Sequence, residues 1–361
     1  MHIIDKYILK RYLATFSVML LLFIPIGIVI DVSEKVNRML QNKVAFSKIA
    51  MYYFDFTVYF ANLLFPIFLF LSVIWFTSKL ANNTEIIAIL SSGISFNRFL
   101  RPYIIGASIV SVFALLMGFF LVPKASEGFN NFRYMYLKGN GRNNMRESAD
   151  VFRQIDSQTY LYVGSFNQVN NTAFSFSLEK FNKDNTLEFK IAATRIKWNA
   201  KDSTYTMFGY TKRTIGVLDD KIDVQQKKDT VFSFELEDLT PTVYVAETLS
   251  LGELNKFIDK ERERGSSNIN TYLVVLYKKY SIPVSAFILT IIAVAVSSMK
   301  RRGGMGMNLA IGIGLAFTFI FFDKIFGVLA EKSTIPPLIA VWIPNISFGI
   351  LAIFLLRNAR K

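Results

Sequence analysis

The chain has 361 residues, of which 52% are hydrophobic, 15% are aromatic and 19% are charged, and its formal net charge is +14. A water-soluble protein of this size carries roughly 25% charged residues, so this composition excludes a simple set of soluble domains. The chain has no cysteine and a single histidine, His2, which excludes disulfide frameworks, thiol catalysis, zinc–thiolate sites and Ser–His–Asp triads.

The positive charge is unevenly distributed along the chain. Residues 124–270 hold 21 basic and 20 acidic side chains, which leaves 20 basic and 7 acidic side chains for the rest. A nucleic-acid-binding protein concentrates basic residues on a polar domain, whereas here they border apolar segments, as the orientation of a membrane protein requires. The chain also lacks a G-x-x-x-x-G-K-[ST] phosphate loop, which excludes ATP hydrolysis by that route.

Three long apolar stretches precede residues 124–270 and three follow them. A hydrocarbon layer about 30 Å thick requires a helix of roughly 20 apolar residues. The first stretch is not a signal peptide, because its apolar run from Leu13 to Ile30 is too long and no A-x-A cleavage site follows it. We therefore predict six membrane-spanning helices, at 12–31, 56–77, 102–122, 282–299, 307–328 and 337–356.

Lysine and arginine residues near the ends of these spans predict the orientation of the chain, because cytoplasmic loops carry an excess of them. One side of the membrane receives twelve: Lys6, Lys10, Arg11, Lys79, Arg98, Arg101, Lys300, Arg301, Arg302, Arg357, Arg360 and Lys361. The short loops on the other side contain five: Lys35, Arg38, Lys43, Lys48 and Lys332. Both termini are therefore predicted to be cytoplasmic, with residues 124–270 on the opposite side of the membrane.

Residues 124–270 contain short runs in which apolar and polar side chains alternate, a pattern typical of β-strands. These runs are Tyr160–Val163, Ala173–Leu178, Leu187–Ala193, Arg195–Trp198, Tyr205–Thr211, Arg213–Val217 and Val231–Leu236. Several short strands at near-regular spacing favour a sandwich or a roll. The block closes with a helix that begins at a capping box, Ser250 with Glu253, and ends at Gly265.

Together these elements predict an α-helical membrane protein with six transmembrane helices and an inserted all-β domain. Residues 1–123 would hold the first three transmembrane helices and a short cytoplasmic helix at about 82–93. Residues 124–270 would form the β domain with its closing amphipathic helix, and residues 271–361 would hold the last three transmembrane helices.

Four stretches of the chain resemble the LptF/LptG (YjgP/YjgQ) permease family, the membrane subunits of the ABC-type lipopolysaccharide export system. They are Ile3–Tyr12 at the start, Ser78–Ser95 between the second and third spans, Thr248–Leu254 at the exit from the β domain, and Ile335–Asn345 in the last span. No single stretch is specific to the family, and the order of all four carries the resemblance.

The resemblance implies a protein of the Gram-negative inner membrane whose outer domain is a periplasmic β-jellyroll. Its partners would be a second LptF/LptG-type permease chain, a cytoplasmic ABC ATPase dimer (LptB-like) and an LptC-like single-span β-jellyroll protein. Lipopolysaccharide would enter through gates beside the first and fifth spans and be squeezed toward a periplasmic bridge. Because another chain would hydrolyse ATP, this subunit would be non-catalytic and would need no cofactor or metal.

Glu85 lies on the short cytoplasmic helix among apolar residues that include Ile86 and Leu90. A carboxylate beside an apolar side chain suits docking into a groove that contains an arginine, because the charge pair sets the register. The resemblance supports this role, since family members carry an acidic residue here that meets the ATPase. The alternative is that Asn82 and Glu85 form a capping box. The two interpretations are compatible.

Lys35 and Arg38 lie three residues apart just beyond the first span, so a continuing helix would present them on one side. By the resemblance, they and Arg133 would hold the phosphorylated sugars of lipopolysaccharide through charge-assisted hydrogen bonds. The alternative is that their side chains only snorkel to the membrane interface. Lys324, near the outer end of the fifth span, is a further candidate for binding these groups, because charges at membrane depth usually face an interior or cavity; the alternative is that it simply pairs with Asp323.

Gly306, Ala310 and Gly314 recur at every fourth residue of the fifth span, a spacing that permits close helix contact. They would serve either packing within the chain or the smooth face of a moving gate. The aromatic residues of the outer domain would form its core or, in part, line a groove for acyl chains; they are Phe174, Phe176, Trp198, Phe232 and Phe234.

A rival hypothesis is a membrane-anchored scaffold whose β domain binds other envelope proteins without transport. This rival predicts that no ATPase binds the chain. An integral-membrane hydrolase is disfavoured, because the predicted spans contain almost no carboxylate pairs and no histidine. No nucleic-acid partner is expected.

Overall fold

The computed structural model describes residues 2–137, 149–167, 170–199, 202, 204–216, 218–232, 234, 244–263, 266, 268–298, 304–332 and 335–359. The chain divides into two compact units. The membrane unit comprises Met1–Val36, Ala45–Phe129 and Asn270–Lys361, and the sheet unit comprises Asn37–Val44 and Asn130–Ile269. Several residues used above lie outside the described part of the chain: Val217, Ser233, Glu235, Leu236, Gly265, Met299, Lys300, Arg301, Arg302, Arg360 and Lys361.

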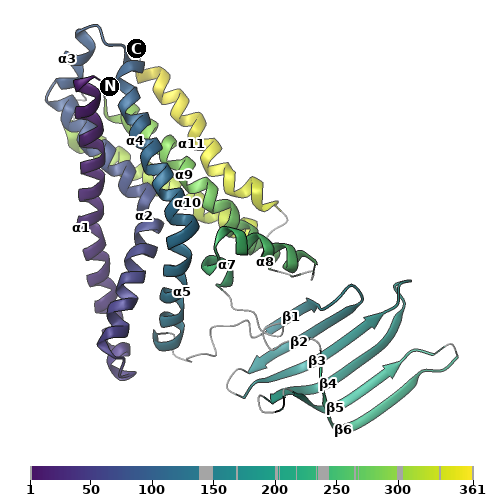
Figure 1. Ribbon diagram of the computed structural model, residues 1–361. Helices are drawn as coiled ribbons and strands as arrows, with labels where there is room; N and C mark the ends of the chain where they lie inside the picture. The colour runs from purple at the N-terminus through teal and green to yellow at the C-terminus, as the bar shows by residue number, and fades with distance from the viewer. Residues whose placement is uncertain are drawn as a thin grey trace. The chain divides into compact units, whose positions relative to one another are not determined.

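Long helices precede and follow the strands in the sequence (Figure 1). The N-terminal helices are α1 (Ile3–Gln41), α2 (Phe46–Asn82), α3 (Glu85–Ser91), α4 (Phe96–Leu116) and α5 (Val122–Phe132), with π-helical segments η1 (Met117–Leu121) and η2 (Arg133–Leu137). The C-terminal helices are α9 (Ile269–Ser297), α10 (Gly304–Lys332) and α11 (Pro337–Ala359). Two shorter helices, α7 (Val245–Thr248) and α8 (Leu251–Glu263), precede α9.

Six helical segments among the described residues are long and apolar enough to cross a membrane, which confirms the predicted number of spans. Five predicted spans fall inside these segments, and the fourth extends beyond the end of α9 at Ser297. The helices are longer than the apolar runs. At 1.5 Å per residue, the 39 residues of α1 cover about 58 Å, roughly twice the thickness of the hydrocarbon layer. The ends of α1 therefore extend beyond the hydrocarbon layer.

The core of the membrane unit lies between helices rather than around α1. In the most apolar part of α9, 67% of the residues are buried, against only 6% in α1. Polar pairs also join the helices: the hydroxyls of Tyr12 and Thr290 lie 3.1 Å apart, and Asn308 Nδ2 donates to Ser78 Oγ at 3.2 Å. Such pairs fix helix positions where water cannot compete. The membrane unit leaves most of the apolar surface of α1 uncovered.

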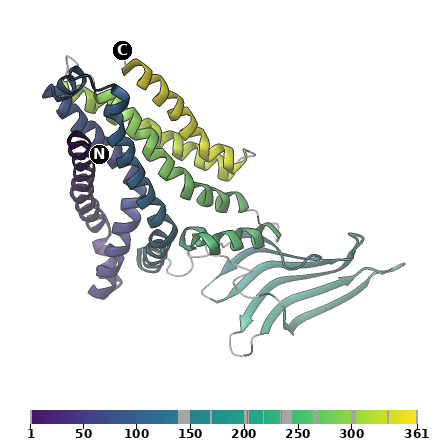
Figure 2. The same cartoon turned by 45° about the horizontal axis from the view of Figure 1, so that its top comes forward.

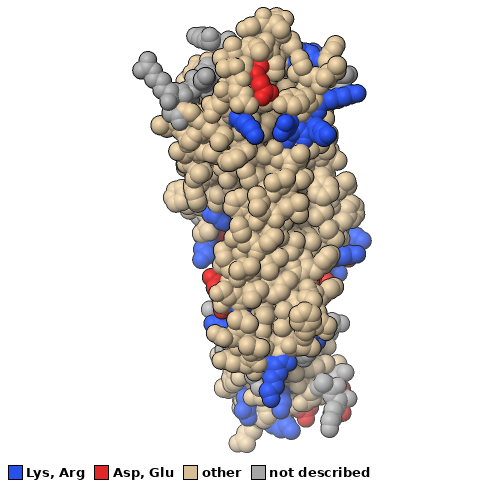
Figure 3. Space-filling view, turned by 90° about the vertical axis from the view of Figure 1, so that its left-hand side faces the viewer, with Lys and Arg blue, Asp and Glu red and all other residues tan. Residues whose placement is uncertain are grey.

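Both chain termini lie at one end of the membrane unit, together with α3 (Figures 1 and 2). In Figure 3 the middle of the face is free of charged side chains; lysine and arginine side chains gather toward its two ends, and further charged side chains appear at its left and right edges. This distribution matches an apolar belt in lipid with basic residues at the interfaces.

Six antiparallel strands form the single sheet of the described residues, paired in sequence order. They are β1 (Ala149–Gln154), β2 (Thr159–Asn167), β3 (Thr172–Phe181), β4 (Leu187–Asn199), β5 (Thr204–Thr214) and β6 (Lys221–Thr230). This arrangement confirms an inserted β domain in a helical membrane protein. The order is a meander in one sheet, whereas a sandwich has two facing sheets.

The boundaries of several predicted strands were wrong. Two pairs of predicted runs are continuous strands, β4 and β5, and the polar strands β1 and β6 were not predicted. The described residues of the run 231–236, Val231, Phe232 and Phe234, lie outside any strand. The rings of Phe232 and Phe234 instead pack on Phe176 and Tyr205. The alternation of apolar and polar side chains therefore predicted correctly that these aromatic residues belong to the core. The prediction that they lie in a strand was wrong.

A crease crosses strands β2 to β5 at Gly164, Ser175, Thr194 and Gly209. On each strand, two consecutive residues face away from the core at this row, so the buried positions change from odd to even or the reverse. Ser175 and Gly209 have positive φ angles of 53° and 64°. A Cβ atom at Gly209 would lie 2.5 Å from Thr194 Oγ1, so this position requires glycine. The crease explains why the alternation in β4 was interrupted at Thr194 and was interpreted as two strands.

Candidate functional site

Glu85 is the first residue of α3, at the end of the membrane unit that holds both termini. The side chain of Ile86 is buried, 2% exposed, and Leu90 packs against the same core. These two residues therefore anchor α3 to its own chain. The apolar side chain that another protein can reach is Ile87, which is 52% exposed. In so short a helix, the spacing of apolar residues alone did not predict which side chains are buried in the chain and which are exposed to a partner.

The carboxylate of Glu85 accepts two hydrogen bonds within the chain. Tyr7 Oη donates to Oε2 at 3.1 Å, and Asn83 Nδ2 donates to Oε1 at 3.1 Å. The predicted capping box with Asn82 is wrong, because α2 continues through Asn82 and Thr84 precedes the first residue of α3. The carboxylate is held at the start of α3, and the bond from Tyr7 connects it to α1.

A second contact joins the same end of α1 to α4. Arg98 Nη2 and Asp5 Oδ2 form an ion pair at 2.7 Å, and the aspartate is largely buried. Arg98 was predicted only to set orientation. Because Tyr7 and Asp5 both lie in the first two turns of α1, the start of α1 is linked to α3 and to α4.

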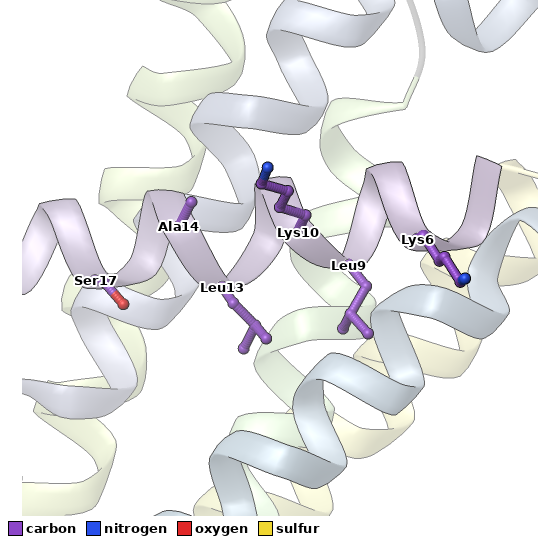
Figure 4. Close-up of a pocket in the computed structure, with 6 residues that line it drawn as sticks. All are labelled: Lys6, Leu9, Lys10, Leu13, Ala14 and Ser17. Carbon is purple, nitrogen blue, oxygen red and sulfur yellow. The ribbon is translucent and has the colours of Figure 1, made fainter. Parts of the chain in front are cut away.

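A shallow groove follows one face of α1 near these contacts (Figure 4). Its lining residues are Lys6, Leu9, Lys10, Leu13, Ala14 and Ser17. Two ammonium groups thus border a strip of apolar and small side chains. This face belongs to the uncovered part of α1, and its lysines are among those that predict a cytoplasmic N-terminus.

At the opposite end of α1, Lys35 belongs to a polar network with Asp31, Tyr52 and Tyr53, which we name the Asp31 network. Lys35 Nζ pairs with Asp31 Oδ1 and donates to Tyr52 Oη at 3.2 Å. Tyr52 Oη and Tyr53 Oη donate to Asp31 Oδ2 at 3.1 and 3.4 Å. Exposed ion pairs four residues apart on a helix contribute only about 0.3–0.5 kcal/mol. This pair differs from an ordinary surface pair in two ways: the Asp31 side chain is only 9% exposed, and two tyrosine hydroxyls also donate hydrogen bonds to it.

Arg38, one turn further along α1, is bound differently. Its Nη1 donates to the carbonyl oxygen of Leu137 at 2.6 Å, and Asn42 Nδ2 donates to the carbonyl oxygen of Tyr136 at 2.8 Å. Both carbonyls belong to η2, which begins at Arg133. A guanidinium has five N–H donors, so this bond leaves Arg38 able to bind an anion as well. The structure therefore brings Arg38 to the segment that carries Arg133.

Lys324 is exposed on α10, and the predicted ion pair with Asp323 is wrong. Asp323 Oδ2 instead pairs with Lys278 Nζ of α9 at 2.9 Å. Adjacent residues of a helix point in different directions, which is why neighbours in sequence do not pair here. Lys278 was not predicted as a functional residue, because its partner lies 45 residues away in the chain.

The small residues of α10 divide between two faces. The buried face contains Gly312, where a Cβ atom would lie 2.3 Å from Ile74 Cδ1 of α2. In contrast, a Cβ at Gly306 or Gly314 would meet nothing within 4 Å, and Ala310 is exposed. The predicted stripe of small residues is therefore not used for packing within the described chain. Its role as a gate stays a prediction.

In the sheet unit, the core contains Phe176, Phe232, Phe234 and Trp198, whereas Phe174 is 39% exposed on the opposite face. The sheet is linked to α8 by an ion pair between Arg153 of β1 and Glu261, each 3% exposed. Removing one partner of such a buried pair typically costs about 3–5 kcal/mol, because the other charge is left buried. This ion pair fixes β1 to the helix that leads toward α9.

The described residues contain no group of three or more His, Cys, Asp or Glu side chains that could hold a metal ion.

A family model described as lipopolysaccharide export system permease LptF/LptG matches residues 6–358. The match covers nearly the whole chain, including all six membrane-spanning segments and the sheet. No curated protein matches the chain.

Proposed function

The chain belongs to the LptF/LptG family of lipopolysaccharide export permeases, and from this premise we propose that it is the non-catalytic subunit that couples an ABC ATPase to lipopolysaccharide movement. Membership makes it a multi-pass permease subunit of the inner membrane. The proposed partners are a cytoplasmic ATPase dimer, a second permease chain of the same family and a single-span β-jellyroll protein. Both termini would be cytoplasmic and the sheet unit periplasmic.

The uncovered apolar surface of α1 is the observation that carries this proposal. Only 6% of the most apolar part of α1 is buried within the chain, although Phe16 and Phe23 pack on Phe65 and Phe68 of α2. In the proposed permease, this uncovered surface would face the cavity or the second chain as well as lipid. The exposed stripe of Gly306, Ala310 and Gly314 on α10 offers a second uncovered face for the same purpose.

The contacts of α3 support a mechanical route for coupling. Ile87 is exposed beside Glu85, which suits docking to a groove of the ATPase. When the ATPase closes, α3 would move, and the bond from Tyr7 would pass this displacement to α1. The ammonium and guanidinium groups of Lys35, Arg38, Arg133 and Lys324 would hold the phosphates of lipopolysaccharide, whose acyl chains would lie against apolar spans.

Affinity purification of the full chain from membranes, with identification of the copurifying chains, tests this proposal. Wild-type protein should bring down a soluble ATPase and a single-span β protein. Glu85→Lys should lose the ATPase and keep the β protein, because it reverses the docking charge. Glu127→Lys is the control for the charge reversal itself, since Glu127 is exposed but lies on α5, far along the chain from α3.

The rival scaffold hypothesis predicts a different result from the same purification. A scaffold would bring down envelope proteins and no ATPase. Equal recovery of the ATPase with Glu85→Lys and with wild type would contradict the coupling role of α3 while leaving the transporter assignment intact.

A further inference from the structure

Lys35 is already neutralised within its own chain. Its Nζ pairs with Asp31 one turn earlier on α1 and also donates to Tyr52 Oη. The ammonium is within 5.9 Å of the centre of the Tyr52 ring as well. A phosphate that binds Lys35 must therefore compete with a carboxylate that is present in every copy of the protein.

Asp31 has hydrogen-bond donors other than Lys35. A buried carboxylate left without any partner is strongly disfavoured, which would make an isolated Asp31–Lys35 pair hard to separate. Here Tyr52 Oη and Tyr53 Oη, both from α2, also donate to Asp31 Oδ2. These donors remain when the ammonium turns away. Without the lysine, the carboxylate of Asp31 would still accept these two hydrogen bonds.

Lys35 is placed so that its ammonium group can exchange the carboxylate of Asp31 for another anion. Its side chain is 23% exposed, whereas that of Asp31 is 9% exposed, so an anion reaches the ammonium before it reaches the carboxylate. A lysine carries its charge on a flexible stem with three donors that rotate freely. Arg38 differs, because its partner is the backbone carbonyl of Leu137 and no acidic side chain competes for it in the described residues.

We propose that Asp31 is a positioning residue that competes with the phosphate groups of lipopolysaccharide for Lys35, so that the bound glycolipid is held weakly enough to be released. This inference rests on the proposed role of Lys35 in binding the substrate. While phosphate is absent, Asp31 holds the ammonium group of Lys35 in place. When the glycolipid moves onward, the ammonium group pairs with Asp31 again. The two tyrosines stabilise the carboxylate in the interval.

Photocrosslinking from Ser33, an exposed neighbour of the network, tests the proposal on the full transporter in lipid nanodiscs that contain lipopolysaccharide. The measured quantities are the crosslinked fraction before ATP and its decay after ATP is added. Asp31→Asn should raise the initial fraction at least threefold and slow its decay, since the amide does not compete for the ammonium. Lys35→Gln should lower the initial fraction, and the double variant should match Lys35→Gln.

Each other outcome contradicts a separate statement. Asp31→Asn with wild-type crosslinking and decay, beside a lowered fraction for Lys35→Gln, would refute competition and leave the role of Lys35 in place. A wild-type fraction for Lys35→Gln would instead refute the proposed substrate site. Lipopolysaccharide stripped of its lipid A phosphates should not respond to Asp31→Asn, and an equal response would show that phosphate is not the competing group.

A second variant keeps the test decisive if Asp31→Asn fails to assemble. Tyr52→Phe with Tyr53→Phe retains the carboxylate and removes the two hydroxyls that stabilise it without the lysine. Asp31 should then hold Lys35 more tightly, and the crosslinked fraction should fall below that of wild type. An unchanged or higher fraction would contradict the exchange.

Discussion

At the start of α8, Ser250 and Glu253 hydrogen-bond each other in both directions. Ser250 donates from its hydroxyl and from its backbone N–H to Glu253 Oε2, at 2.7 and 3.0 Å. The backbone N–H of Glu253 donates in return to Ser250 Oγ at 3.5 Å. The bonds from the side chain and backbone of Ser250 hold the pKa of Glu253 below its ordinary value. This is the capping box predicted from the sequence, and it starts a helix whose residues Leu254 and Ile258 are buried.

The lowered pKa of Glu253 makes the helix start sensitive to acid. Since the folded-state pKa is lower than the ordinary value of about 4.3, the stabilisation is fully present above that value and is lost as the pH falls through the folded-state pKa. At pH 7, the amides in the first turn of α8 should therefore exchange hydrogen more slowly in the wild-type protein than in Glu253→Gln. The advantage of wild type should shrink as the pH falls below the ordinary pKa of a glutamate. An advantage that does not change with pH would contradict a role for the charge.

The contacts of Glu85 and Lys35 show which features of a site a sequence can predict. A helix through residues 31–38 places Asp31 four residues before Lys35, so that pair could have been anticipated from spacing. Tyr7 is 78 residues from Glu85, and no local pattern signals their hydrogen bond. Residue types and membrane ends were thus predictable, whereas their partners depend on how distant helices pack.

At the scale of elements, α10 provides a matched pair of glycines two residues apart. A Cβ at Gly312 would lie 2.3 Å from Ile74 Cδ1, whereas a Cβ at Gly314 would meet nothing within 4 Å. Gly312→Ala should destabilise the membrane unit by up to about 1 kcal/mol, the low end of overpacking costs, because the end of the buried Ile74 side chain must shift to admit the new methyl group. Gly314→Ala should leave its stability almost unchanged. Thermal unfolding of the purified chain in detergent compares the two, and equal losses would contradict the assigned faces of α10.

The two kinds of element were predicted with different success for a physical reason. Six long apolar runs could satisfy their backbones in lipid only as helices, so hydropathy alone identified them. A strand needs its neighbours, and the polar strand β6, Lys221–Thr230, has no apolar alternation that would mark it. Phe232 and Phe234 alternate like strand residues yet lie outside any strand, because packing on Phe176 satisfies their hydrophobicity without it.

For the whole molecule, the proposed orientation in the membrane follows from the distribution of lysine and arginine. Because the chain has no cysteine, single cysteines can report it without further changes. Asp184→Cys, in the exposed turn between β3 and β4, should react with a membrane-impermeant maleimide in intact spheroplasts. Ser91→Cys, exposed at the end of α3, should react only after the membrane is opened. The reverse pattern would invert the topology and place α3 away from any cytoplasmic ATPase.

The crease across β2 to β5 constrains how this protein can change over evolutionary time. A one-residue deletion within a strand transfers all later side chains to the other face, and the four strands reverse their faces at the same row. Losing Thr194 alone would set the far half of β4 out of phase with both neighbours. Length variation among descendants of this gene should therefore accumulate in the hairpins, while the row of Gly164, Ser175, Thr194 and Gly209 is inherited as a block.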